Sequence, residues 1–177
     1  MELQTARLLL LEFVPADAPA VHTYASDENV TRYTDWGPNT TEETEEFFLE
    51  VLRAGEAQPR NSFLFAITLN QSPAIGCARL GIVSMADRVG DLGYVLNAEY
   101  WGQGIATEAT QRLLTFGFED LGLHRIFATC HPDNVGSSHV LEKAGFQLEG
   151  RLREDKLVRG VYRDSLLYAI LESTQHF

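Results

Sequence analysis

The chain has little cysteine, little basic charge and no long apolar run. Its only cysteines are Cys77 and Cys130, and each lies in an apolar, strand-like stretch. Two lone cysteines in a chain without an export signal indicate a reducing, cytosolic setting and no disulfide. The leading apolar run, residues 8–11, is too short to span a membrane, and it lacks the basic start of a signal peptide.

Basic residues are outnumbered by acidic ones. The chain has 14 Lys and Arg against 25 Asp and Glu, which gives a formal charge of −11 and a sequence pI near 4.8. A nucleic-acid site or an anionic-membrane site needs a basic face, so neither partner is predicted. Cationic partners such as amines suit this charge, although solubility alone also accounts for it.

The chain also lacks the spacing of a metal site. Four histidines show no ligand spacing with cysteines or acids: His22, His124, His139 and His176. No zinc site is therefore predicted. Cys130 and His131 are neighbours on an expected strand, where adjacent side chains point to opposite faces. They would make a poor nucleophile–base pair, and core packing is the favoured interpretation.

Length and composition favour a single domain over residues 1–177. Hydrophobic residues make up 45% of the chain, which is ample for one core. No Pro/Ser-rich linker, low-complexity tract or internal repeat interrupts it. The oligomeric state stays open, with a homodimer among the options.

Two glycines precede a strongly helical segment. Gly102 and Gly104 follow an expected strand, residues 91–97, and precede an expected helix, residues 105–121. Glycine lets the backbone adopt positive φ and approach a ligand closely, and the first helical turn offers N–H groups without helical partners. Together they predict a cradle for a phosphate at the start of this helix.

Two familiar phosphate loops fit this segment poorly. A P-loop ends in Gly-Lys-Ser/Thr, whereas Gly104 is followed by Ile105 and Ala106. A dinucleotide fingerprint needs a third small residue and a later acid, but Thr107 and residues 123–124 stand near those positions. A glycine-rich turn before an ordinary helix stays open as the plainer alternative.

Two motifs of the chain resemble those of the GNAT acetyltransferases. The acetyl-CoA loop of that superfamily, Arg/Gln-x-x-Gly-x-Gly/Ala, is similar to residues 101–106, with Trp101 at the Arg/Gln position. The second motif, Asn-x-x-Ser followed by Glu-Lys-x-Gly-Phe, is similar to residues 134–146. The two ends, residues 5–10 and 160–168, resemble the RimJ/RimL branch, whose known members acetylate protein N-termini. The resemblance covers about residues 5–171.

The resemblance implies an acetyl-CoA-dependent N-acetyltransferase that acts on a primary amine by direct attack in a ternary complex. Backbone groups before the loop would hold pantetheine, one strand N–H would polarise the thioester carbonyl, and the loop would hold the pyrophosphate. The implied cofactor-binding residues are Val95, Leu96, Trp101, Gly102, Gln103, Gly104, Ile105, Ala106, Thr107, Asn134 and Lys143.

The resemblance leaves the proton chemistry open. Many GNAT enzymes protonate the departing thiolate with a tyrosine whose position here is Leu141, and Ser137 is the RimL-like replacement. A helix-capping role would also explain Ser137, and Asn134 would either hold cofactor or substrate or cap the helix. The RimL base matches Lys156, which is a poor base. The other candidates for the general base are acids, each of which is also explained as a solvated surface residue. They are Glu12, Glu99, Glu149, Glu154, Asp155 and Asp164.

Residues 31–38 are implied to line the substrate entrance. Tyr33 and Trp36 flank Asp35 and would either hold a cationic amine or pack the loop onto the sheet. The pKa of an α-amine is about 2.5 units below that of lysine, so it needs roughly 3 kcal/mol less help to be neutral at pH 7. The missing strong base therefore favours a protein N-terminal α-amine as acceptor.

Apolar periodicity and turn residues predict an α+β fold. Strands are expected over residues 7–13, 62–69, 74–84, 88–97, 125–131, 146–155 and 161–171, with a turn at 70–73. Helices are expected over 15–26, from 41, over 105–121, with Glu108 and Arg112 as an ion pair, and within 133–145. The order matches the GNAT fold, a central mixed and mostly antiparallel splayed sheet flanked by helices, in which residues 91–97 and 125–131 diverge.

Three rival functions remain. A non-catalytic acyl-CoA-binding or sensor domain would also lack the usual tyrosine and base. An acetyltransferase for a small amine, such as a polyamine, an antibiotic or an amino acid, would share the same motifs. A dinucleotide-binding enzyme is the third and has the poorest loop match.

Overall fold

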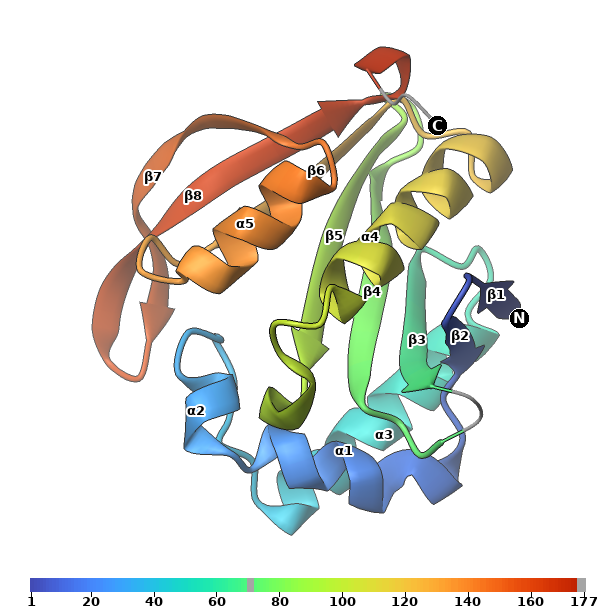
Figure 1. The fold of residues 1–177 in the computed structure, drawn as a ribbon, viewed down its shortest axis with the longest axis vertical. Coiled ribbons are helices and arrows are strands. Elements are labelled where there is room, and N and C mark those ends of the chain that lie inside the picture. Colours follow the sequence, from blue (N-terminus) through green and yellow to red (C-terminus); the bar gives the residue numbers. More distant parts are fainter. Residues whose placement is uncertain (70–71, 175–177) are drawn as a thin grey trace.

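The computed structural model describes residues 1–69 and 72–174, which are organised by one eight-stranded sheet (Figure 1). The strand order is β1-β2-β3-β4-β5-β6-β8-β7, and only β5 and β6 pair in parallel. The strands are β1 (Glu2–Gln4), β2 (Leu8–Glu12), β3 (Ser62–Leu69), β4 (Gly76–Ser84), β5 (Val89–Leu96), β6 (Arg125–Cys130), β7 (Gln147–Val158) and β8 (Val161–Leu171). Asn70 and Gln71 of the expected turn, and His176, lie outside the described residues.

Helices cover both faces of this sheet. The helices are α1 (Ala18–Ala25), α2 (Glu28–Thr31), α3 (Thr41–Glu56), α4 (Ile105–Thr115) and α5 (Val135–Lys143). Helices α4 and α5 pack on one face, whereas α1 and α3 pack on the other (Figure 1). The expected α+β order is confirmed, and β1 and α2 are additions to it. Within the described residues, no helix is long and apolar enough to cross a membrane.

Alternation along the strands divides the core between the two faces. In β4, Ala78 and Leu80 belong to the cluster under α4 and α5, whereas Cys77 belongs to the cluster under α1 and α3. In β5, Leu92 and Leu96 likewise face α4 and α5. Strands β4 and β5 therefore carry one set of side chains towards each helical layer, since Val95 packs against the cluster under α1 and α3.

Helix α4 is shorter than its apolar periodicity predicts. It ends at Thr115 and continues as a π-helical turn over Phe116–Asp120. In this turn Gly117 lies so close to β6 that a Cβ there would be 2.6 Å from Ile126 Cδ1. The turn thus brings the chain onto the sheet before β6 begins.

Strands β5 and β6 separate soon after they meet. They pair only from Val89↔Arg125 to Asp91↔Phe127. Beyond that point β5 stays beside β4 as far as Leu96, while β6 stays beside β8 as far as Cys130. Backbone groups on the open side of β5 are left without a strand partner, which is an edge that a ligand can use. The expected splay is confirmed.

Candidate active site

A cavity of about 1320 Å³ lies where β5 and β6 diverge. Its wall is built from β5, the end of β6, the start of α4, helix α5, the loop after α2 and part of α3. Of the expected site residues, those that line it are Tyr33, Trp36, Val95, Leu96, Trp101, Gly102, Gly104, Ile105, Ala106, Thr107, Asn134, Ser137 and Lys143. Gln103 is the exception, because its side chain turns back to donate to the Glu99 carbonyl at 3.1 Å.

The loop before α4 presents a row of backbone amides. Gly102 and Gly104 adopt φ of 74° and 75°, and Gly104 is the N-cap of α4. Within the described residues, the amides from Gly102 to Thr107 make no hydrogen bond to another protein group. Their N–H groups and the positive end of the helix dipole can together hold an anion.

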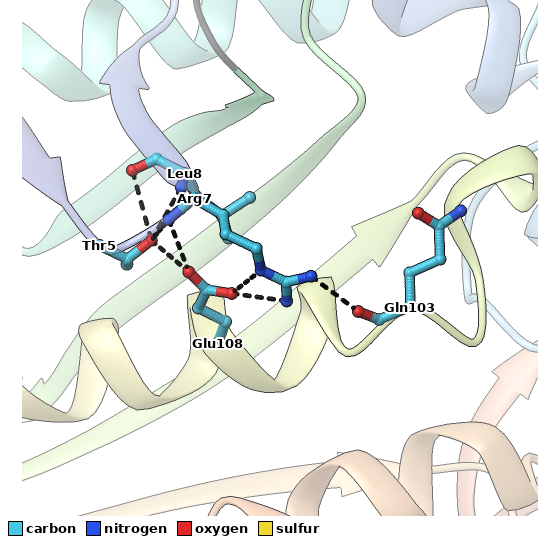
Figure 2. A network of polar contacts seen from close by, with 5 residues as sticks. All are labelled: Thr5, Arg7, Leu8, Gln103 and Glu108. Carbon is cyan, nitrogen blue, oxygen red and sulfur yellow. Dashed lines mark hydrogen bonds and ion pairs between the residues drawn. The ribbon is translucent and has the colours of Figure 1, made fainter.

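A charged network ties this loop to the start of the chain (Figure 2). Glu108, in the first turn of α4, accepts from the Thr5 hydroxyl at 2.6 Å and from Arg7 Nε at 2.6 Å. Arg7 Nη1 donates to the Gln103 carbonyl at 3.1 Å. Burial alone would raise the pKa of Glu108, but the hydrogen bonds from Thr5 and Arg7 outweigh it and the net pKa is lowered. Arg7 also supplies positive charge beside the cradle of an acidic protein.

The expected ion pair between Glu108 and Arg112 is wrong. Glu108 is held by Arg7 instead, and Arg112 Nη1 is buried without a hydrogen-bond partner among the described residues. The reason is tertiary, since the turn between β1 and β2 reaches the first turn of α4 and offers a backbone N–H as well as two side chains.

We expect Arg7→Ala to lower the thermal midpoint by about 2–4 °C, because losing a half-exposed ion pair with hydrogen bonds costs about 1 kcal/mol in a chain of this size. Differential scanning calorimetry measures the shift. Arg53→Ala is the control, since Arg53 is exposed on α3 and makes no ion pair with the described residues. Equal midpoints for the two variants would contradict a structural role for Arg7.

On β5, the backbone N–H and C=O groups that point into the gap between β5 and β6 are those of Leu96 and not those of Val95. Asn97 N donates to Ile75 O at 2.9 Å, and the Val95 carbonyl lies so close to Gly76 that a Cβ there would collide with it. Both groups therefore face β4, and alternation turns the backbone groups of Leu96 to the open side. The prediction that the Val95 backbone holds pantetheine is corrected accordingly, although Val95 still lines the cavity.

Trp101 links the loop to the end of β5. Its indole Nε1 donates to the Leu96 carbonyl at 2.8 Å, and half of the side chain is exposed. This bond leaves Leu96 with its N–H as the open backbone group on the gap. A tryptophan at the position of the family's Arg or Gln thus has a structural role that its residue type alone did not predict.

Asn134 and Ser137, at the start of helix α5, have different roles. Asn134 is the N-cap, and its Oδ1 accepts from Ser137 N at 3.1 Å. The Ser137 hydroxyl does not cap, because its Oγ lies 2.9 Å from the hydroxyl of Tyr94 on β5. The capping interpretation of the Ser137 side chain is therefore wrong. Leu141 is fully buried in the core.

The two cysteines are free and buried, as two lone cysteines predicted. Burial raises the pKa of Cys77 to about 12 and also raises that of Cys130. A raised thiol pKa disfavours the nucleophilic thiolate. The ring of His131 stacks on Tyr33, with centroids 5.1 Å apart and planes inclined by 28°, so this histidine packs against the loop after α2.

Three basic residues of the β7–β8 hairpin hold the loop after α2. Lys156 Nζ contacts Asp35 Oδ2 at 2.9 Å, Arg159 donates to the Trp36 carbonyl at 2.9 Å, and Arg163 donates to the Arg32 carbonyl at 3.3 Å. Burial raises the pKa of Asp35, but the hydrogen bond and charge of Lys156 outweigh it and the net pKa is lowered. The Trp36 side chain stays partly exposed on the cavity wall.

The cavity wall is rich in carboxylates. Those that line it are Asp35, Glu43, Glu46, Glu50, Asp91, Asp133 and Asp164. Glu43, Glu46 and Glu50 follow one another at helical spacing along α3, which places them on one face. Asp35, Asp91 and Asp164 are each paired with a basic side chain, so the acidic face of α3 is the part of the wall that can attract a cationic ligand.

The candidate bases are mostly paired or distant. Asp164 lines the cavity but contacts Arg151 Nε at 2.6 Å, and Lys156 is paired with Asp35. Glu149 is held by Arg125, and Glu12 by Arg60, both outside this cavity. Glu99, Glu154 and Asp155 do not line it either. A water chain stays as an alternative route for the proton.

In the described part of the chain, no group of three or more His, Cys, Asp or Glu side chains is arranged to hold a metal ion.

Three features of the site were not predicted from the sequence. Tyr94, Arg7 and the acidic face of α3 each depend on how distant elements dock. Period-two alternation could have placed the Tyr94 side chain on the same face of the sheet as Leu96, the face that α4 and α5 cover. No sequence pattern indicates that Arg7 contacts a loop almost a hundred residues later.

Comparison with known proteins agrees with this geometry. A model of the acetyltransferase (GNAT) domain matches residues 7–147. An uncharacterized N-acetyltransferase of Bacillus subtilis (strain 168), YnaD, is 33% identical over 172 residues, 97% of this chain and 98% of YnaD. The spermidine N(1)-acetyltransferase of Escherichia coli (strain K12) is 26% identical over 158 residues, 88% of this chain and 81% of that protein.

Solved structures share the whole fold. A GNAT-family acetyltransferase from Bacillus anthracis superposes with a TM-score of 0.84 and 33% identity, over 98% of this chain and 99% of that one. Mycobacterium smegmatis RimJ, in complex with CoA-disulfide, superposes with a TM-score of 0.83 and 28% identity, over 94% of this chain and 82% of that one. The expected GNAT fold is thereby confirmed.

Proposed function

Because this chain belongs to the GNAT acetyltransferase family, we propose that it transfers the acetyl group of acetyl-CoA directly to a protein N-terminal α-amine. The observation that carries the proposal is the row of unpaired amides at the start of α4, beside the open edge of β5. The amides at the start of α4 can bind the anionic end of coenzyme A, and the open edge of β5 can align its pantetheine arm.

The start of α4 and the edge of β5 would each bind a different part of the cofactor. The pyrophosphate would lie against the amides from Gly102 to Thr107, with Lys143 on the same cavity wall adding positive charge. The pantetheine amides would pair with the open side of β5, where Leu96 keeps its N–H. This pairing would direct the thioester towards Ser137, which lines the same cavity.

The reaction follows from alignment and charge. A neutral amine attacks the thioester carbon, the C–S bond breaks, and its electron pair leaves on sulfur. A β5 N–H can stabilise the carbonyl oxygen as charge develops on it, and the Ser137 hydroxyl can donate to the sulfur. The proton that the amine nitrogen loses balances the departing thiolate. Alignment of the reactants alone is worth several kcal/mol.

Two observations support an α-amine as acceptor. RimJ of Mycobacterium smegmatis is 28% identical over nearly the whole chain. The bases considered from the sequence are paired or outside the cavity, which leaves deprotonation to other acids of the wall or to water, and an amine of lower pKa needs less of that help. A small polyamine is the second candidate, because carboxylates line the cavity and a relative is a spermidine N(1)-acetyltransferase.

Steady-state kinetics separates these acceptors. Acetyl-CoA is supplied with two matched peptides, one with a free α-amine and a blocked lysine and the other with the reverse, and with spermidine. We expect a higher kcat/KM for the α-amine, and we expect Trp36→Ala to raise the KM for the amine more than the KM for acetyl-CoA. Equal use of the lysine peptide, or unchanged amine kinetics in Trp36→Ala, would contradict the assignment of acceptor and entrance.

A further inference from the structure

A tyrosine from β5 reaches the polar residue of α5 on which the proposed chemistry depends. The Tyr94 hydroxyl lies 2.9 Å from Ser137 Oγ and 3.1 Å from the Ser137 carbonyl oxygen, within hydrogen-bond reach of both. Both residues line the cavity at the divergence of β5 and β6. The Tyr94 ring packs against the core under α4 and α5, and this packing holds the hydroxyl in place.

The two hydroxyl hydrogens allow two arrangements. If Tyr94 donates to the Ser137 carbonyl, the serine hydroxyl can donate back to Tyr94, and its hydrogen is not available to a ligand. If Tyr94 donates to Ser137 Oγ, the serine hydrogen is free to point into the cavity. An anionic sulfur at the end of the pantetheine arm selects the second arrangement, because only that one gives it a donor.

In the second arrangement Tyr94 makes Ser137 a better donor. A hydroxyl that accepts one hydrogen bond donates its own hydrogen more strongly, because each bond polarises the next. Burial raises the pKa of the Tyr94 phenol well above its ordinary value, and the hydrogen bond to Ser137 offsets only part of this rise. Tyr94 therefore stays protonated and acts as a donor throughout.

We infer that Tyr94 is a positioning residue that directs the hydrogen of Ser137 towards the departing thiolate. Ser137 is then the donor to the sulfur, a role that many GNAT enzymes give to a tyrosine at the position of Leu141. The inference rests on the proposed acetyl transfer. The C–S bond breaks with its electron pair on sulfur, Ser137 donates a hydrogen bond to that charge, and Tyr94 keeps its proton.

A double-mutant cycle distinguishes this role from simple packing. Tyr94→Phe removes one oxygen and keeps the ring, so we expect kcat to fall at least about ten-fold while the KM for acetyl-CoA changes less than about two-fold. Because Tyr94 acts through Ser137, adding Tyr94→Phe to Ser137→Ala should cause no further loss. If the losses multiply in the double variant, or if Tyr94→Phe keeps its full kcat, the inference is overturned.

Tyr168→Phe is the matched control. Its hydroxyl also reaches α5, where it donates to Glu142 at 3.2 Å, but it does not line the cavity. If Tyr94 merely anchors α5, both variants should lose similar activity, whereas the inference expects normal kcat in Tyr168→Phe. Absence of transfer by the wild-type protein would instead refute the proposed function. Should Tyr94→Phe fail to fold, 3-fluorotyrosine at position 94 keeps the hydroxyl with a lower pKa, and an unchanged kcat would then overturn the inference.

Discussion

Gly104→Val is expected to weaken acetyl-CoA binding by at least about ten-fold, a cost of 1.4 kcal/mol or more. Gly104 has φ of 75°, where a β-branched residue is strongly strained, and it is the N-cap of α4. A side chain here would cover the amides that we propose bind the pyrophosphate. Its Cβ would lie 3.6 Å from Arg7 Nη2, an ordinary van der Waals distance, beside the network in Figure 2.

Isothermal titration calorimetry on the folded variant measures this loss. Gly122→Val is the control, because Gly122 has a similar φ of 65° but does not line the cavity. The control should lose stability and keep its affinity for acetyl-CoA. If Gly104→Val binds acetyl-CoA as tightly as the wild-type protein, the amide cradle is not the cofactor site.

Ser137→Ala is expected to lower kcat by about 100-fold and to leave the KM for acetyl-CoA nearly unchanged. A fixed donor to developing charge contributes about 2.7–4 kcal/mol to a transition state. The helix cap survives the change, because the capping bond runs from the Ser137 backbone N–H to Asn134 Oδ1. The thermal midpoint should therefore move little.

Ser138→Ala is the matched control for this prediction. Ser138 is the next residue of α5, its hydroxyl lies 3.5 Å from Cys130 Sγ, and it does not line the cavity. Steady-state kinetics and thermal unfolding of both variants suffice. Normal turnover in Ser137→Ala, together with a clear loss of stability, would show that the hydroxyl supports the helix and not the reaction.

The fold was accessible from the sequence because its signals are local. Apolar stretches separated by turn residues marked β3, β4 and β5, and the helix expected from residue 41 is α3, which the capping box of Thr40 and Glu43 starts. The splay between β5 and β6 followed from the resemblance and was confirmed by their three residue pairs. The end of α4 was missed because a glycine contact with β6, at Gly117, changes the helix there.

The candidate site was only partly accessible. The glycine motif placed the loop on the cavity wall, but the pairing of Trp101 with Leu96 and of Arg7 with Glu108 depends on tertiary docking. The same holds for Ser137, whose hydroxyl partner comes from β5 and not from its own helix. Sequence spacing predicts neighbours along an element, whereas these contacts join elements that are distant in the chain.

Mass spectrometry of a complete reaction tests the central claim most directly. The purified protein is incubated with acetyl-CoA and an amine pool that includes a peptide with a free N-terminus, and both products are quantified. We expect free coenzyme A and peptide acetylated at its α-amine in equal amounts, with no acetyl group left on the protein. Saturable binding of acetyl-CoA without acetylation of any amine would contradict the proposed acetyl transfer and favour a sensor domain.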